Sequence, residues 1–182
     1  QRCIRASVEW SRHQVRVYDT AGLRRKAKIT ELAEKLSASD AVRAINFAEV
    51  VVLLIDAECP FEHQDLTIGD MATQEGRALV IAVNKWDLIE DKQKQLKELR
   101  ETAAQRLSQV PGVAVVPISA LSGRGLVQLT RAVLDAYERW NRRIPTAALN
   151  RWLEEAVAKH SPPAVRGQRI RIRYMTQASA RP

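Results

Sequence analysis

The order of apolar and polar positions along the chain predicts strands separated by helices. Three short runs, residues 50–56, 78–84 and 113–118, are almost continuously apolar and rich in β-branched side chains. Such runs are typical of strands that are buried on both faces of a parallel sheet. Apolar positions recur at helical spacing in the segments near 63–75, 91–109 and 125–140. This alternation predicts an α/β fold with helices on both faces of the sheet.

The N-terminal residues have a different pattern, which predicts a β-hairpin. Residues 4–10 and 14–19 alternate between apolar and polar side chains on either side of Ser11-Arg12-His13. A polar and basic stretch, Gly22 to Ser39, follows without a clear period. Beyond it, a short helical stripe is predicted from the spacing of Ala41, Val42, Ile45 and Ala48.

The C-terminal residues predict a second unit that begins after Arg142-Arg143-Ile144-Pro145. An amphipathic helix is predicted from positions at i, i+3, i+4, i+7 and i+8, which are Leu149, Trp152, Leu153, Ala156 and Val157. Pro162 and Pro163 end this helix, and the alternation from Arg169 to Tyr174 predicts a strand. One helix and one strand cannot close a core, so we predict a domain at 1–143 and an incomplete one at 144–182.

Composition and charge narrow the class of protein. The chain has 182 residues, of which 46% are hydrophobic and 27% are charged, enough for one ordinary domain and part of another. It has no apolar run of about 18 residues, and its two cysteines cannot form a disulfide framework, so we predict a cytoplasmic protein without a membrane partner. From Asn141 onward there are nine basic and two acidic side chains, so this tail carries +7 of the net charge of +8. Such asymmetry favours a polyanionic partner for the tail.

The first motif whose residues suit binding or catalysis is Asp19-Thr20-Ala21-Gly22, where a predicted strand ends. The carboxylate of Asp19 suits a Mg²⁺-bound water, and the backbone N–H of Gly22 is free to approach a phosphate closely. Asp19 and Gly22 are therefore the candidate catalytic residues, with Thr20, Ala21 and Leu23 beside them. Taken alone, the motif is common and also fits an ordinary turn.

The second motif, Asn84-Lys85-Trp86-Asp87, directly follows a predicted buried strand. The carboxylate of Asp87 can accept hydrogen bonds from the N1–H and the exocyclic amino group of guanine, a donor pair that adenine does not have. Asn84 can bond the purine N7, and the stem of Lys85 can cover the face of the ring. The other interpretation is a surface turn with a solvated lysine.

The third motif, Ser119-Ala120, is weak by itself but follows the last predicted strand. A small residue at this point lets a backbone N–H reach the carbonyl oxygen of guanine. The order and spacing carry the prediction: 65 residues separate Asp19 from Asn84, and 35 separate Asn84 from Ser119. Each motif ends a separate strand, in the order that a GTP-binding domain requires.

With these motifs the sequence resembles the Der (EngA) family of bacterial GTPases. The resemblance rests on Asp19 to Arg25, on Asn84 to Asp87, and on Pro162 to Gly167 with Arg169 to Tyr174. It implies the second of two tandem GTPase domains, with a Ras-like doubly wound sheet, and then the start of a KH-like α+β domain. It further implies GTP or GDP as ligand, Mg²⁺ as cofactor, an N-terminal GTPase domain in cis, and assembly of the large ribosomal subunit as the function.

Parts of the family pattern are absent from this sequence. The phosphate-binding loop G-x-x-x-x-G-K-[ST] occurs nowhere, and the sheet's first strand is expected with it, before Gln1. We therefore predict a fragment of a longer protein, inactive by itself and open at the middle of the sheet. Leu23 stands where Ras-type enzymes have the glutamine that orients water. The resemblance implies K⁺ stimulation instead. The basic stretch Arg24, Arg25, Lys26 and Lys28 fits part of a mobile switch and equally fits a solvated loop.

The basic tail has two interpretations. Its alternating arginines suit contact with RNA phosphates, and the candidates are Arg166, Arg169, Arg171 and Arg173. The same alternation is typical of a half-exposed sheet, and the KH signature loop GXXG is absent. The resemblance favours contact with rRNA or the ribosomal subunit. The alternative for the whole chain is a non-catalytic RNA- or protein-interaction module on a GTPase scaffold.

Overall fold

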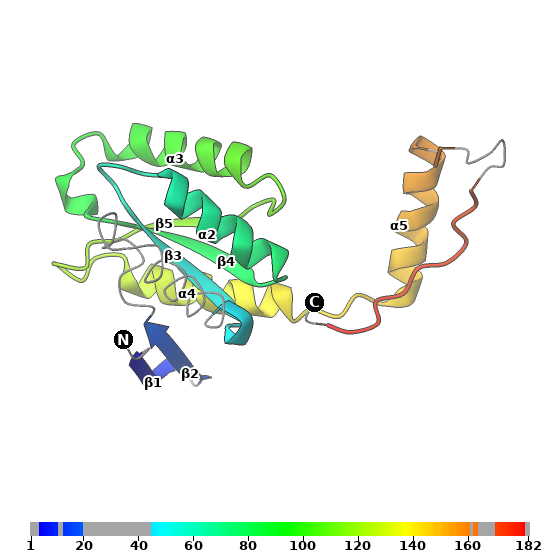
Figure 1. Ribbon diagram of the computed structural model, residues 1–182, viewed down its shortest axis with the longest axis horizontal. Coiled ribbons are helices and arrows are strands. Elements are labelled where there is room, and N and C mark those ends of the chain that lie inside the picture. Colours follow the sequence, from blue (N-terminus) through cyan, green and yellow to red (C-terminus); the bar gives the residue numbers. More distant parts are fainter. Residues whose placement is uncertain (1–3, 11–12, 20–44, 161, 164–169, 181–182) are drawn as a thin grey trace, which may run out of the picture. The chain divides into compact units, whose positions relative to one another are not determined.

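The computed structural model describes residues 4–10, 13–19, 45–160, 162–163 and 170–180 (Figure 1). The chain forms two compact units, Gln1–Glu138 and Arg139–Pro182, and each is described by itself. Within the described ranges, no helix combines the length and the apolar character needed to cross a bilayer.

The first unit is built around a three-stranded parallel sheet. Its strands lie in the order β3 (Val50–Asp56), β4 (Ala78–Asn84) and β5 (Ala114–Pro117). Its helices are α2 (His63–Gln74), α3 (Lys92–Arg106) and α4 (Leu126–Trp140). Because all three strands run in the same direction, their carboxyl ends share one edge, and Asp56 lies opposite Asn84 in the register. The predicted α/β alternation is confirmed.

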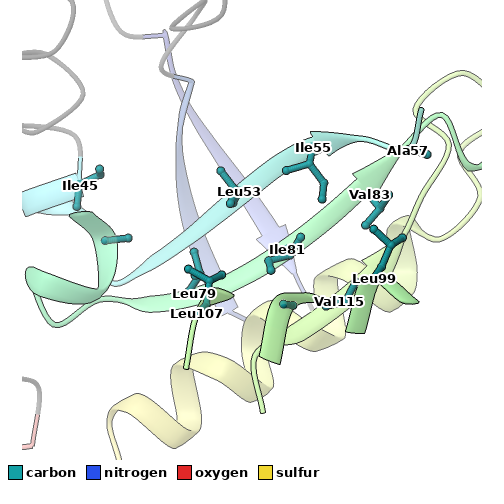
Figure 2. Packing of buried hydrophobic residues seen from close by; sticks show 12 residues of the cluster. Ile45, Leu53, Ile55, Ala57, Leu79, Ile81, Val83, Leu99, Leu107 and Val115 are labelled. Carbon is teal, nitrogen blue, oxygen red and sulfur yellow. The ribbon is translucent and has the colours of Figure 1, made fainter. Parts of the chain in front are cut away.

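Two hydrophobic clusters pack on the two faces of this sheet. The larger one joins the strands to α2 and α3, and includes Ile55, Ile81 and Leu107, all fully buried (Figure 2). The smaller one joins β4 and β5 to α4 through Val80, Val133 and other side chains. Helices therefore cover both faces of β4, whose five central residues are all buried.

The outer strand β3 departs from the prediction that it would be buried on both faces. Leu53 and Ile55 are buried toward α2 and α3, but Val52 and Leu54, on the opposite face, are 40% and 51% exposed. The reason is the placement of α4, whose buried residues pack with side chains of β4 and β5. An apolar run predicts a strand, but the helix that covers each face decides the burial.

The hairpin is confirmed as a separate two-stranded antiparallel sheet. Strand β1 (Ile4–Trp10) pairs with β2 (His13–Asp19), with Trp10 opposite His13 and Ile4 opposite Asp19. Trp10 also packs against the cluster beneath α4. Among the described residues, no ladder joins this hairpin to the three-stranded sheet. The stretch from Gly22 to Ser39 lies outside the described residues, and so do Ala41 and Val42 of the predicted helical stripe, whereas its described residues 45–47 are helical.

The second unit contains helix α5 (Thr146–Lys159), as predicted, and a segment over residues 170–180. The prediction of a strand from Arg169 to Tyr174 is wrong for its described part, because residues 170–174 have no ladder partner within the described part of the chain. Alternation supplies the side-chain pattern of a strand, but a strand also needs a neighbour for its backbone groups.

In place of strand pairing, two side-chain amides, those of Asn150 and Gln177, hydrogen-bond the segment 170–180 to the residues of α5 and those just before it. Asn150 of α5 donates from Nδ2 to the carbonyl oxygen of Met175, and its Oδ1 accepts the Met175 N–H, both at 2.9 Å. Gln177 accepts the Ile144 N–H at 2.8 Å through its Oε1. Because Asn150 also donates to the carbonyl oxygen of Thr146 at 2.8 Å, its rotamer is set within the helix.

Replacing Asn150 with Ala is expected to release the Met175 end of this segment. The change leaves a half-buried N–H and carbonyl without their partners, at a cost of about 1–3 kcal/mol. We expect the Met175 amide to exchange its hydrogen at least tenfold faster, by hydrogen-exchange mass spectrometry on the full gene product. Gln93→Ala, on the exposed side of α3, is the control and should leave this exchange unchanged. If the Met175 amide is equally protected from exchange in the Asn150→Ala variant, the Asn150 side chain does not hold this part of the segment.

Candidate functional site

The candidate site is formed by two loops at the carboxyl edge of the parallel sheet. One loop, Asn84–Asp87, follows β4, and the other, Ser119–Gly125, follows β5. Ligands bind at this edge in open α/β sheets, because the loops there converge above the strand ends. The structure thus brings the second and third predicted motifs together, although 35 residues separate them in the chain.

Direct hydrogen bonds tie the two loops to each other. Asn84 accepts the Ala120 N–H through its Oδ1 at 2.9 Å, and the Trp86 N–H donates to the carbonyl oxygen of Ile118 at 3.0 Å. With its oxygen used in this way, Asn84 presents its Nδ2 as a donor, which is the complement of an acceptor such as purine N7. The Ala120 N–H, a candidate for a base oxygen, is bonded to Asn84 here.

The backbone turns sharply after Asn84. Lys85 has φ of +63°, in the left-handed region, and a 3₁₀ turn, Trp86–Leu88, follows it. The Leu88 N–H closes this turn on the carbonyl oxygen of Lys85 at 3.0 Å. Non-glycine residues rarely adopt this conformation and cluster at functional sites when they do. Asp87 is the middle residue of this turn, and its exposed side chain contacts Ser119 of the second loop.

Asp87 is held in its charged form. A hydrogen bond from the side chain of Ser119 lowers the pKa of the Asp87 carboxyl below its usual value, and a bond from its own backbone N–H adds to this shift. Ser119 is only 2% exposed, and its Oγ accepts the Ser122 N–H at 3.2 Å, which leaves the hydroxyl proton for Asp87. The carboxylate therefore faces the site as an acceptor only.

The second loop is a compact turn. The Ser119 N–H donates to the carbonyl oxygen of Arg124, and the Gly123 N–H donates to that of Ser119, both at 2.9 Å. Gly123 and Gly125 have φ of +76° and +81°, a region that side chains other than glycine rarely adopt. These glycines let the chain reverse within a few residues, while Ser119 stays buried and its side chain bonds Asp87.

Sequence reasoning missed the partners of Lys85. Its Nζ lies 2.6 Å from Oδ2 of Asp56, at the end of β3, and 3.4 Å from Oε2 of Glu58. The hydrogen bond to Asp56 raises the pKa of Lys85 above its ordinary value, and Glu58 adds to the effect. The parallel pairing of the runs 50–56 and 78–84, once assumed, would have placed Asp56 opposite Asn84 and signalled this contact.

The first predicted motif is described only at its start. Asp19 ends β2 and is exposed, while Thr20, Ala21, Gly22 and Leu23 lie outside the described residues. The basic stretch from Arg24 to Lys28 also lies outside the described residues. In the described part of the chain, no group of three or more His, Cys, Asp or Glu side chains is arranged to hold a metal ion.

The predicted RNA-contact residues are also described in part. Arg171 and Arg173 are exposed in the segment 170–180, which Asn150 of α5 bonds at Met175. Arg166 and Arg169 lie outside the described residues.

Comparisons with known families agree with this geometry. The family described as the elongation factor Tu GTP binding domain matches residues 5–139, and the family described as the KH-domain-like region of EngA bacterial GTPase enzymes matches residues 143–182. Solved structures agree on the fold. The crystal structure of Era in complex with MgGDPNP and nucleotides 1506–1542 of 16S ribosomal RNA is 21% identical, with a TM-score of 0.63 over 74% of this chain and 44% of that one. The first unit thus has the fold of P-loop GTPases and is a GTP-binding domain by class.

The sequence comparison identifies the family more narrowly. GTPase Der of Dinoroseobacter shibae is 58% identical over 98% of this chain and 36% of its own length, and GTPase Der of Rhodopseudomonas palustris is 55% identical over 98% and 39%. The chain belongs to the elongation factor Tu type family of GTP-binding domains, and the predicted resemblance to GTPase Der is confirmed over both units. The chain spans little more than a third of the length of these relatives.

Proposed function

We propose that the full gene product containing this chain binds GTP and hydrolyses it to GDP and phosphate. The observation that carries the proposal is the pair of cross-linked loops, in which Asp87 is kept ionised beside Ser119 while Asn84 offers a donor. In the reaction, a water oxygen forms a bond to the γ-phosphorus. The bond from that phosphorus to the bridging oxygen breaks, and GDP leaves with the bridging oxygen.

The base would be selected by complementary hydrogen bonds. The Asp87 carboxylate would accept from the N1–H and the exocyclic amino group of guanine, while Asn84 would donate to N7. Adenine has no N1–H and presents its amino group elsewhere, so it would leave the carboxylate unpaired. Lys85 and Trp86 would cover the base, and Ser119 and Ala120 would complete the pocket by holding Asp87 and Asn84.

The phosphate end would be formed around Asp19 to Leu23. The Asp19 carboxylate is a hard oxygen ligand that fits Mg²⁺ through a water, since this ion is usually held by one or two carboxylates together with substrate phosphates. When bound, Mg²⁺ would neutralise charge on the phosphates. The Gly22 N–H would donate to the γ-phosphate, next to Thr20 and Ala21. Leu23 cannot orient the attacking water, so other groups, with K⁺ as a stimulating ion, would do so.

The second unit would connect this reaction to the ribosome. We assign residues 1–143 to the GTPase domain and 144–182 to the KH-like domain, and the family matches that end at 139 and begin at 143 support this boundary. The +7 tail, with exposed Arg171 and Arg173, supports contact with RNA phosphates, and Arg166 and Arg169 are further candidates. The protein would act in the cytoplasm as an assembly factor for the large ribosomal subunit, together with a further GTPase domain in cis.

Replacing Asp87 with Ala tests the base pocket. We expect the full gene product to bind GDP in preference to ADP, and the variant to lose that preference by about a hundredfold because both bonds to the carboxylate disappear. Calorimetric titration of the two diphosphates measures this ratio. Glu90→Ala, which removes an exposed carboxylate three residues later, is the control and should keep the preference for GDP over ADP. If the wild-type protein binds neither nucleotide, the chain is instead a non-catalytic RNA- or protein-interaction module.

The preference should also withstand mild acid. A lowered pKa means that the interaction with the charged carboxylate is present above the ordinary range of an aspartate and is lost only as the pH falls through the depressed value. The GDP-to-ADP affinity ratio is therefore expected to stay constant from about pH 7.5 down to about pH 4, where an aspartate with an ordinary pKa is already about half protonated. A ratio that falls to about half near pH 4 would show that the pKa of Asp87 is not lowered and that the Ser119 hydroxyl does not stabilise its charged form.

A further inference from the structure

A carboxylate on the neighbouring strand lies against the lysine of the base loop. Asp56 ends β3 directly opposite Asn84, and this last pair of the ladder is closed by the Ala57 N–H, which donates to the carbonyl oxygen of Asn84 at 2.9 Å. The backbone of Asp56 is thus held by sheet bonds next to the residue that precedes Lys85. The 2.6 Å contact between Lys85 Nζ and Asp56 Oδ2 is therefore built into the sheet edge.

The carboxylate is itself oriented. The Glu58 N–H donates to Oδ1 of Asp56 at 3.0 Å, which leaves Oδ2 for the ammonium group of Lys85. The side chain of Asp56 is 21% exposed, against 48% for Lys85 and 55% for Glu58. An ion pair with one oriented and largely shielded partner orders a long side chain better than a pair between two exposed ones. Glu58, more distant and more exposed, contributes less.

We propose that Asp56 is a positioning residue for Lys85 in the base pocket. Lys85 lies between Asn84 and Asp87, the two residues that would bond opposite edges of the base, and its backbone is fixed by the left-handed turn. An ammonium group held at Asp56 fixes both ends of the four-carbon stem. The stem is then ordered before the nucleotide arrives, and its apolar side is available to cover the face of the ring. This inference rests on the proposed function.

The proposal predicts a loss of affinity that depends on Lys85. In the full gene product, Asp56→Asn keeps the shape of the side chain and removes its charge, and the Kd for GDP is expected to rise about tenfold. The GDP-to-ADP preference should persist, because Asp87 is intact. Glu101→Gln, which breaks the exposed pair with Lys97 on α3, removes a similar charge far along the chain and should leave the Kd unchanged.

A double-mutant cycle separates positioning from a structural role. Lys85→Met keeps an apolar stem but has no ammonium group to anchor, so adding Asp56→Asn to it should change the Kd less than twofold. An equal tenfold loss in both backgrounds would overturn the proposal, and so would an unchanged Kd in Asp56→Asn alone. If the wild-type protein shows no preference for GDP over ADP, the proposed function fails together with this inference. If that preference is present, the double-mutant cycle tests only whether Asp56 acts on GDP binding through Lys85.

Discussion

The Asp87→Asn variant is expected to exchange its preferred base from guanine to xanthine. A carboxamide keeps one acceptor but adds a donor, Nδ2, at the position of the second carboxylate oxygen. That donor opposes the amino group of guanine and matches the carbonyl oxygen that xanthine carries at the same position. Because one partner loses a bond and the other gains one, we expect the ratio of xanthine to guanine nucleotide affinity to rise by about 10⁴.

This exchange is measured by competition between GDP and xanthosine diphosphate for the full gene product. The side chain of Ser119 still has a partner in the variant, because its hydroxyl can donate to the Asn oxygen, so the loop is expected to keep its form. Glu90→Gln makes the same chemical change three residues later and should leave the guanine preference as it was. A variant that still prefers GDP would show that Asp87 does not face the base.

The Gly125→Ala variant is expected to lose at least about 3 kcal/mol of unfolding free energy. Gly125 has φ of +81°, and a Cβ at this residue would collide with the carbonyl oxygen of Pro117 and lie 3.0 Å from Cα of Ile118. Both of those are backbone atoms at the end of β5 and its exit, so neither can move without breaking the strand that carries Ser119. The substitution therefore damages both the fold and the base loop.

Gly123→Ala is the matched control for this prediction. Gly123 has a similar φ, +76°, but no atom lies within 4 Å of an added Cβ. The variant therefore pays only the left-handed backbone cost, about 1–2 kcal/mol. Urea unfolding of the full gene product, followed by tryptophan fluorescence, measures both, since Trp86 and Trp10 lie in the first unit. Equal losses in the two variants would show that Gly125 is not packed against Pro117.

Much of the fold could be predicted because local pattern and local structure agree in the first unit. The runs 50–56 and 78–84 became β3 and β4 with the predicted bounds, and the two predicted hairpin strands pair with each other, although His13 lies in the second strand and not in the connection. The prediction was wrong where a partner decides the outcome. Val52 and Leu54 are exposed because α4 packs under the other strands, and residues 170–174 have no pairing strand among the residues that the structure describes.

The candidate site divides in the same way. The residue types and their order predicted which loops would select a base, since the donors of guanine require a carboxylate such as Asp87. The predicted roles of Asp19 and of Thr20 to Leu23 remain predictions, because the structure describes only Asp19 among these residues. Asp56 escaped notice because its importance depends on a neighbour 29 residues later in the chain, Lys85.

The sequence by itself determined the class of this protein, because strand-forming runs and short polar motifs at their ends are local properties of the chain. It determined the separation of a nearly neutral first part from a strongly basic tail as well. Only the tertiary structure decided which groups hold the site in place: the Asn84 bond to Ala120, the support of Asp87 by Ser119, and the Asp56 contact with Lys85. These are contacts between strand ends that parallel pairing brings together, and no local pattern encodes such distances.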